Sequence, residues 1–537
     1  MFKFDPFSYR YASRRNVVYG TRGMTATSNP LAAAAGMEIL KKGGNAADAA
    51  IATAAALTVV EPTGNGLGSD AFAIIWKDGK LHGLNASGPA PEACTIEKYR
   101  SLGCADEIPQ RGWLSATVPG APAAWAELSS KMGRLPLSVC LEPAILYAEE
   151  GYAAAVTVSR LWDNAYRAFG SLGGAIFKHW FDAFCPNGRA PRPGEPVRLP
   201  HHARTLRLIA ESGARDFYEG ETAEKIIAFS ESSGGLYSAY DLSSFAPEWV
   251  EPISVKYKGF DVWEMPPNGQ GITALVALKI LDGLDIPDGH DCPFTVHKQI
   301  EAIKLAFADA KRYVADPKFS AVPVDELLSD DYAASRRALI GPTAREFSAG
   351  SPYSGGTVYL SAADADGCMV SYIQSNFNGF GSAVVVPETG IALNNRAKCF
   401  SLDPSHPNAL APRKRPYNTI IPAFLSQGGE PIGPFGVMGA YMQPQGHVQV
   451  IMNCLLFGMN PQDALDAPRW QWTGGMKVSV EPSFHSSAAQ KLSRMGHDVT
   501  HELHSTDFGR GQIIWRTEEG SLAGATEPRT DGAVEAW

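Results

Sequence analysis

The segment from Asn45 to Val60 limits the possible folds more than any other part of the sequence. It is apolar, rich in alanine, and interrupted by a single charge, Asp48. Asn45 can cap a helix at its start, and Pro62 would end that helix. The stretch is shorter than the ~20 apolar residues that a membrane-spanning helix needs. Its small side chains suit close packing on a β-sheet, so we expect a soluble protein with a helix against a sheet.

The residues around this segment predict its neighbouring elements. Ser28 or Asn29 can cap an earlier helix that has Pro30 at its first position. The glycines of residues 64–68 form a loop that leads into a strand, and a turn connects that strand to a second one. The expected elements are a helix over 30–40 and strands over 71–76 and 80–84.

Further along the chain, helical periodicity gives way to strand-like segments. Amphipathic helical windows alternate with loops between about residues 119 and 313, and strands with glycine-rich turns are expected from residue 349. The clearest elements are a helix over 300–309, strands within 357–374 and 390–394, and a helix over 448–457. A length of 537 residues suggests several domains, but no repeat or linker-like stretch divides the chain.

Composition and charge exclude several classes of protein. A hydrophobic fraction of 45% with 19% charged residues is typical of a globular chain and not of a disordered one. The formal net charge of −9 argues against nucleic-acid binding, because phosphate contacts need a basic surface. The first twenty residues lack the apolar core of a secretory signal, so we expect a cytoplasmic protein. We expect no nucleic-acid or membrane partner, and a small-molecule substrate.

The sequence also lacks the common metal and cofactor motifs. None of the eight cysteines has C-x-x-C spacing, so free thiols are expected. The histidines of His501-Glu502-Leu503-His504 lie three residues apart, whereas a helical zinc motif requires a spacing of four. The glycines of 64–68 precede a strand, whereas a dinucleotide-binding loop follows one. We therefore expect no metal and no cofactor, and we interpret His201-His202 as a solvated loop pair.

Thr357 is the candidate catalytic residue. It follows Gly355-Gly356 and begins a strand-like run, and no G-x-S-x-G motif is present. A threonine at the start of a chain can catalyse acyl transfer, because its hydroxyl is the nucleophile and its own α-amine is the base. That chemistry requires a cut between Gly356 and Thr357. On its own the tripeptide is a weak signal, and the alternative interpretation is a loop that enters a strand.

Several motifs in collinear order make the chain resemble the γ-glutamyltransferase (γ-glutamyltranspeptidase) family of N-terminal-nucleophile hydrolases. The resemblance covers nearly the whole chain. Its motifs lie at residues 43–50, 64–70, 117–120, 266–271, 301–307, 315–317, 355–357, 390–395, 414–416 and 467–469.

The resemblance implies an α+β fold, a four-layer αββα sandwich. It also implies a proenzyme that cuts itself into residues 1–356 and 357–537, and these fragments would stay associated in one intertwined fold. A higher homo-oligomer of the pair is compatible with it. The implied substrate is a small amide, and the implied chemistry uses no cofactor.

Carried over residue by residue, the resemblance retains the machinery for amide cleavage. Thr357 matches the nucleophile, and Ser375 matches the family's second threonine, which hydrogen-bonds the nucleophile. The family's Gly-Gly oxyanion hole falls on Gly439 and Ala440. Its donors are backbone N–H groups, so alanine is acceptable if the backbone angles suit.

The substrate-recognition positions depart from the family pattern. The family's arginine for the α-carboxylate and its aspartate for the α-amine are both missing, and a new cation has appeared. The matching positions are Ser87 for the arginine, Cys399 for the aspartate, Arg396 for a Glu or Gln, Asn418 and Thr419 for paired serines, and Asn376 beside Phe377 for an asparagine.

These departures leave three functions open. The family default is a γ-glutamyl amide such as glutathione. The second is a glutaryl-like ω-carboxyacyl amide without an α-amino group, as for cephalosporin acylases, with Arg396 receiving the terminal carboxylate. In that case the alternative for Arg396 is a structural ion pair. The third is a non-catalytic binding homologue, against which the retained Thr357 and Ser375 argue.

Overall fold

The alanine-rich segment forms a buried helix, as predicted. The computed structural model describes residues 10–11, 15–287, 289–347 and 357–537. In it α2 (Ala46–Val60) has every residue buried. The Asn45 side chain accepts hydrogen bonds from the N–H groups of Ala47 and Asp48, and the Asp48 carboxylate accepts one from the Asn45 N–H. This capping box satisfies amides that a helix start would otherwise leave unpaired.

Two antiparallel β-sheets of seven strands each form the centre of the molecule. The first sheet consists, in spatial order, of β1 (Val18–Gly20), β18 (Leu522–Thr526), β17 (Arg510–Arg516), β13 (Glu430–Met438), β12 (Ala423–Gln427), β9 (Phe260–Glu264) and β8 (Ile253–Tyr257). The second consists of β19 (Ala533–Ala536), β2 (Gly23–Thr27), β10 (Val358–Asp364), β11 (Met369–Ser375), β3 (Asp70–Lys77), β4 (Lys80–Ala86) and β7 (Glu248–Val250).

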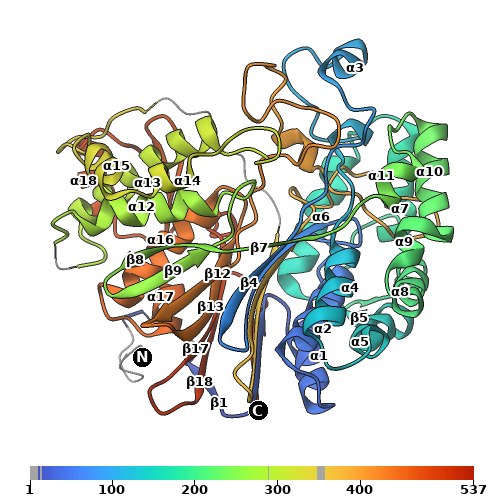
Figure 1. The fold of residues 1–537 in the computed structure, drawn as a ribbon, viewed down its shortest axis with the longest axis horizontal. Helices are drawn as coiled ribbons and strands as arrows, with labels where there is room; N and C mark the ends of the chain where they lie inside the picture. Colours follow the sequence, from blue (N-terminus) through green and yellow to red (C-terminus); the bar gives the residue numbers. More distant parts are fainter. Residues whose placement is uncertain (1–9, 12–14, 288, 348–356) are drawn as a thin grey trace.

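Helices cover the outer face of each sheet (Figure 1). The helices on the second sheet or just behind it are α1 (Pro30–Lys41), α2, α4 (Ala121–Met132), α5 (Leu137–Glu150) and α8 (Pro200–Ser212). Those on the side of the first sheet are α12 (Gly271–Asp282), α13 (Pro293–Tyr313), α16 (Met442–Leu455), α17 (Pro461–Asp466) and α18 (Ser486–Arg494).

The remaining elements lie around this sandwich. They are α3 (Ile96–Ser101), α6 (Val156–Phe169), α7 (Lys178–Phe184), α9 (Arg215–Glu219), α10 (Glu221–Ser233), α11 (Ala239–Ser243), α14 (Val324–Leu327), α15 (Asp330–Arg337), the strands β5 (Tyr152–Ala153), β6 (Pro196–Val197), β14 (Trp470–Gly474), β15 (Lys477–Val480) and β16 (Asp498–His501), and three short 3₁₀ turns.

The strand alternation explains why four layers form. In β10, Val358 and Leu360 belong to the core beneath the helices, whereas Tyr359 belongs to the core between the sheets. Side chains of one strand point alternately to opposite faces, so a strand that is apolar on both faces needs a cover on each. The predicted α+β, four-layer αββα fold is confirmed.

Most elements expected from the sequence are present, and two interpretations are wrong. Residues 390–394 form isolated bridges, Val385 with Ala392 and Gly68 with Leu393, and not a strand. His202 lies on α8, is buried and contacts the Thr58 hydroxyl, so it is no solvated loop residue. All eight cysteines are free thiols. Among the described residues, no helix has both the length and the apolar character to cross a membrane.

Candidate active site

Antiparallel pairing brings Thr357 and Ser375 together. Thr357 directly precedes β10, Ser375 ends β11, and Val358 pairs with Gln374. The Thr357 Oγ1 lies 2.9 Å from the Ser375 Oγ, and both side chains are fully buried. The Ser375 Oγ also accepts a hydrogen bond of 2.8 Å from the Phe377 N–H. The serine hydroxyl therefore holds the threonine hydroxyl in a fixed position, the role expected for the second hydroxyl of this site.

The glycine loop lies against the backbone of Thr357. A Cβ added to Gly64 would lie 3.1 Å from the Thr357 carbonyl oxygen, and the Gly64 carbonyl accepts from the Asn376 N–H at 3.3 Å. Asn376 is buried, and its Oδ1 accepts from the Ser69 hydroxyl. A side chain at position 64 would press on the candidate nucleophile. Gly356, on the other side of the expected cut, lies outside the described residues.

Gly439 and Ala440 follow β13 of the opposite sheet. Their φ angles are +138° and +49°, both in the region that L side chains rarely adopt. The Gln270 amide donates to the Ala440 carbonyl at 2.8 Å, and the Met442 N–H donates to the Gly439 carbonyl at 2.9 Å. These bonds fix an unusual backbone turn, which alanine tolerates at position 440 at a cost of about 1 kcal/mol.

Arg396 is engaged in a buried ion pair. Its Nε and Nη2 donate to the two carboxylate oxygens of Asp70 at 2.9 and 3.2 Å, and neither side chain is exposed. Burial opposes the charge of Arg396, but the Asp70 carboxylate outweighs burial and raises the pKa of the guanidinium. The guanidinium also lies 4.8 Å from the Phe377 ring centre. The geometry thus matches the ion-pair alternative for Arg396.

Three other candidate recognition residues belong to the same network. The Asn418 amide donates to Asp70 at 2.6 Å, and the Thr419 hydroxyl accepts from the Arg396 Nη1 at 2.7 Å. Burial raises the pKa of the Cys399 thiol to about 11, so it is uncharged at neutral pH, beside Arg396. The network satisfies its own charges, and both oxygens of Asp70 are occupied.

The Ser87 hydroxyl is engaged by neighbouring side chains in this structure. Its hydroxyl donates to the Asn85 Oδ1 at 2.7 Å and accepts from the Asn268 amide at 3.2 Å, and it is fully buried. The Asn268 carbonyl in turn accepts from the Asn418 N–H. Ser87 therefore supports the same buried network from the side of β4.

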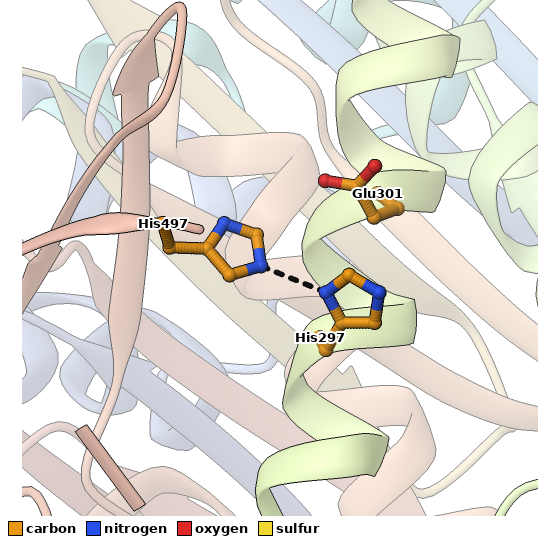
Figure 2. A group of neighbouring side chains, drawn as sticks. All are labelled: His297, Glu301 and His497. Carbon is orange, nitrogen blue, oxygen red and sulfur yellow. Dashed lines mark hydrogen bonds between the residues drawn. The ribbon is translucent and has the colours of Figure 1, made fainter. Parts of the chain in front are cut away.

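One cluster in the described part of the chain combines three potential metal ligands: His297, Glu301 and His497 (Figure 2). The His297 Nδ1 lies 2.8 Å from the His497 Nε2, and its other nitrogen bonds a backbone carbonyl. The Glu301 oxygens accept from Lys304 at 2.7 Å and from the Arg345 N–H at 3.1 Å. Of the three residues, only His497 keeps a ring nitrogen without a partner. The Lys304 ammonium bonded to Glu301 would also repel a cation, so these residues do not fit a metal.

Sequence reasoning missed Asp70 as a partner of Arg396. A signal was present, because Asp70 is the only charged residue between Glu61 and Lys77. An isolated charge at the start of a strand that is otherwise buried needs a partner of opposite sign. The sequence does not say which cation that is, since Asp70 and Arg396 lie 326 residues apart.

The chain is similar to known proteins in both sequence and fold. A family model described as gamma-glutamyltranspeptidase matches residues 32–537. The chain is 37% identical to the glutathione hydrolase-like YwrD proenzyme of Bacillus subtilis and 34% identical to the oxamate amidohydrolase proenzyme of Klebsiella pneumoniae, each over 96% of this chain and 99% of the relative. The crystal structure of cephalosporin acylase from Bacillus halodurans superposes with a TM-score of 0.95 at 57% identity, over 100% of this chain and 99% of that one.

Proposed function

The chain belongs to the γ-glutamyltranspeptidase family of N-terminal-nucleophile hydrolases and is an amide-hydrolysing enzyme, and from this premise we propose that it is an acylase. Its substrate is an amide whose acyl group carries a carboxylate but no α-amino group. The observation that carries this proposal is the closed pairing of Asp70 with Arg396 and Asn418.

A γ-glutamyl group would need a carboxylate side chain to bind its ammonium and a cationic side chain to bind its α-carboxylate. At the positions matched to the family's recognition residues, Asp70 is the neighbouring carboxylate, and its oxygens already bind Arg396 and Asn418. Opening this buried pair would leave unpaired charges, which costs several kcal/mol. An acyl group without an ammonium avoids that cost.

The names of the relatives support the same substrate class. Oxamate is an amide whose acyl group bears a carboxylate and no amino group, and a relative of 34% identity is named for its hydrolysis. The solved structure at 57% identity is named as a cephalosporin acylase. We therefore place the substrate among carboxylate-bearing acyl amides, of which a glutaryl amide is a convenient probe.

The proposed chemistry begins with self-cleavage between Gly356 and Thr357, which yields residues 1–356 and 357–537. The new α-amine of Thr357 then takes the proton of its own hydroxyl, and Oγ1 forms a bond to the amide carbon of the substrate. Backbone N–H groups of Gly439 and Ala440 stabilise the oxyanion. The C–N bond breaks as the amine leaves with the proton, and water releases the acid from the acyl-enzyme.

Denaturing gel electrophoresis and N-terminal sequencing test the processing step. The purified protein should give two bands, one of which begins at Thr357, while Thr357→Ala should stay a single chain without amidase activity. The two fragments should remain associated in the native protein. Amide hydrolysis by the uncut chain, or by the Thr357→Ala variant, would overturn the mechanism.

A γ-glutamyl substrate is the competing function, and one observation favours it. Asp507 is exposed and lines a cavity that also contains Gly439, so it offers a carboxylate for an ammonium near the site. If the substrate is γ-glutamyl, Asp507→Asn should raise KM for γ-glutamyl p-nitroanilide at least tenfold. If the acylase proposal holds, the same variant should leave glutaryl hydrolysis within about threefold.

The deciding experiment compares two anilides that differ only by the α-amino group. The mature enzyme should hydrolyse glutaryl p-nitroanilide with a kcat/KM at least tenfold higher than that for γ-glutamyl p-nitroanilide, because an ammonium could use the Asp70 carboxylate only by opening its buried pair with Arg396. A preference for the γ-glutamyl anilide would refute the acylase and support the family default. Absence of turnover of both, in a fully cleaved preparation, would refute both.

A further inference from the structure

A cavity of about 230 Å³ lies beside the candidate active site. Gly64 and Gly439 contribute to its wall. A Cβ added to Gly64 would lie 3.1 Å from the Thr357 carbonyl oxygen, and Gly439 is half of the candidate oxyanion hole. The cavity therefore borders two residues that lie next to the candidate reacting groups, although Thr357 itself does not line it. It includes none of the residues of the Asp70–Arg396 network, so a ligand in it meets a different set of side chains.

Arg111 lines this cavity, as the Asp507 carboxylate does, but the two are not paired. Its Nη1 donates to the carbonyl oxygens of Gly379 and Gly381, and its guanidinium lies 4.7 Å from the Phe169 ring centre. No carboxylate among the described residues lies within ion-pair distance of it. Burial lowers the pKa of Arg111 to about 10, so the group is still charged at neutral pH. The ring and the carbonyls fix the direction of the guanidinium.

Arg510 lines the same cavity from the first residue of β17. It is only 6% exposed, and its Nη1 lies 3.3 Å from the Glu61 Oε1. The Arg510 Nε is buried and has no hydrogen-bond partner among the described residues. Glu61 is further bonded by the Ser28 hydroxyl at 2.6 Å. The Arg510 Nε is thus an unused donor, and a buried donor without a partner is costly unless a ligand or a water molecule bonds to it.

Building on the proposed function, we propose that Arg111 and Arg510 bind the carboxylate of the substrate in this cavity. A guanidinium presents parallel N–H donors that match the two oxygens of a carboxylate. Two such groups beside Gly439 would hold the charged end of the substrate while its amide carbon meets Thr357. They would take over the function of the family arginine that Ser87 replaces, and Arg396 would have no part in it.

The carboxylate can come from the acyl group or from the leaving amine, and three anilides of the same length separate these sources. Glutaryl p-nitroanilide carries the charge on the acyl group. Pentanoyl 4-aminobenzoate carries it on the leaving amine. Pentanoyl p-nitroanilide carries no charge and reports on the catalytic machinery alone. Each is assayed with the mature wild type and with the variants Arg111→Gln and Arg510→Gln.

We expect each variant to raise KM at least tenfold for one charged substrate, with kcat changed less than threefold and the neutral anilide unaffected. The charged substrate that responds identifies the source of the carboxylate. Arg160→Gln is the matched control, because Arg160 is exposed and bonds Thr506 at the rim of the cavity without lining it. It should behave as wild type. Equal losses on charged and neutral substrates, or no loss on either, would overturn the proposal.

Two further measurements separate the carboxylate site from effects on folding and from the identity of the substrate. Arg510→Gln leaves Glu61 without its cation, so the double variant Glu61→Gln/Arg510→Gln repeats the test if the single variant fails to mature. Calorimetry with glutarate measures the site without turnover. We expect the wild type to bind glutarate at least tenfold more tightly than Arg111→Gln does; no binding, or equal binding, contradicts the carboxylate site. Glutarate binding without hydrolysis of glutaryl amides would refute the proposed function alone.

Discussion

A single oxygen at position 375 connects the backbone of the candidate site to its proposed nucleophile, Thr357. The Ser375 Oγ accepts from the Phe377 N–H and contacts the Thr357 hydroxyl. Phe377 has a φ of +73°, a strained value for a bulky residue. The hydroxyl thus stabilises a turn as well as orienting Thr357. The family's threonine differs from serine only by a methyl group, which takes no part in either bond.

Ser375→Ala should therefore slow the reaction and spare the fold. We expect kcat for glutaryl p-nitroanilide to fall about 10- to 100-fold, since a lost hydrogen bond to a reacting group costs about 1–3 kcal/mol. Ser375→Thr should keep most of the activity. The control is Ser371→Ala on the same strand, whose hydroxyl bonds the Tyr359 hydroxyl at 2.7 Å. Full activity of Ser375→Ala would show that the contact with Thr357 has no catalytic role.

Asp70 should matter for stability more than for chemistry. Asp70→Asn leaves the charge of Arg396 buried without a counterion, which should lower the free energy of unfolding by about 3–5 kcal/mol. Adding Arg396→Gln to the same chain should recover much of the loss. Urea titration of the mature protein measures this. The exposed pair of Arg134 and Asp366 is the control, and Asp366→Asn should change stability by about 0.5 kcal/mol or less. An equally small effect of Asp70→Asn would contradict the ion-pair interpretation.

At the scale of elements, the sequence predicted what local chemistry determines. Asn29 and Asn45 cap α1 and α2 as expected, and the strand-like runs on either side of the hairpin turn form β3 and β4. Such elements are encoded by neighbours within a few residues. The predicted strand over residues 390–394 is wrong because the backbone bonds of this segment go to Gly68 and to residues 382–386, which gives only isolated bridges. These partners are set by the tertiary fold.

In the candidate site too, linear motifs predicted some residues, and only the folded structure identified others. Thr357, Ser375, Gly439 and Ala440 came from a resemblance in linear motifs, and the structure places the first two in contact. The role of Arg396 was left open because its partner comes from a distant strand. Arg111 and Arg510 gave no local signal at all, since only the folded cavity brings them together. Pairings between distant segments depend on topology, which a single sequence does not state.

The contact of α8 with α2 should make stability depend on pH. His202 of α8 bonds the Thr58 hydroxyl of α2 at 3.0 Å, and burial lowers its pKa to about 4. Unfolded histidine has a pKa of about 6.5, so between pH 6.5 and about 4 the unfolded chain binds a proton that the folded chain does not. The folded state therefore loses up to about 1.4 kcal/mol per pH unit as the pH falls through this range.

Urea titrations at several pH values test this contribution. His202→Gln removes the titrating group and keeps an amide donor for Thr58, so its stability should fall less steeply with falling pH than that of the wild type. The matched control is His201→Gln, because His201 is the exposed neighbour on the same helix. Equal slopes for His202→Gln and the wild type would rule out a contribution from this histidine.

At the scale of the whole molecule, the proposed cut would separate two chains that are woven together. β10 and β11 would belong to the C-terminal fragment, yet they lie between β2 and β3 of the N-terminal fragment. The other sheet is interleaved too, since β12 pairs with β9 and β18 with β1. Each sheet thus shares its hydrogen bonds and its apolar core between the two fragments.

Cleavage should therefore leave the fold intact, with the two fragments held together. The described strands include five pairs that join the fragments: β1–β18, β2–β10, β3–β11, β9–β12 and β2–β19. Separating the fragments would expose both sheets along whole strands and open the core between them, a cost close to that of unfolding. We expect the fragments to co-elute in size-exclusion chromatography in buffer and to separate only at urea concentrations that also abolish the tertiary circular dichroism signal. Release of either fragment before that transition would mean that the sheets are not shared as the structure shows, and the uncut Thr357→Ala chain supplies the reference profile.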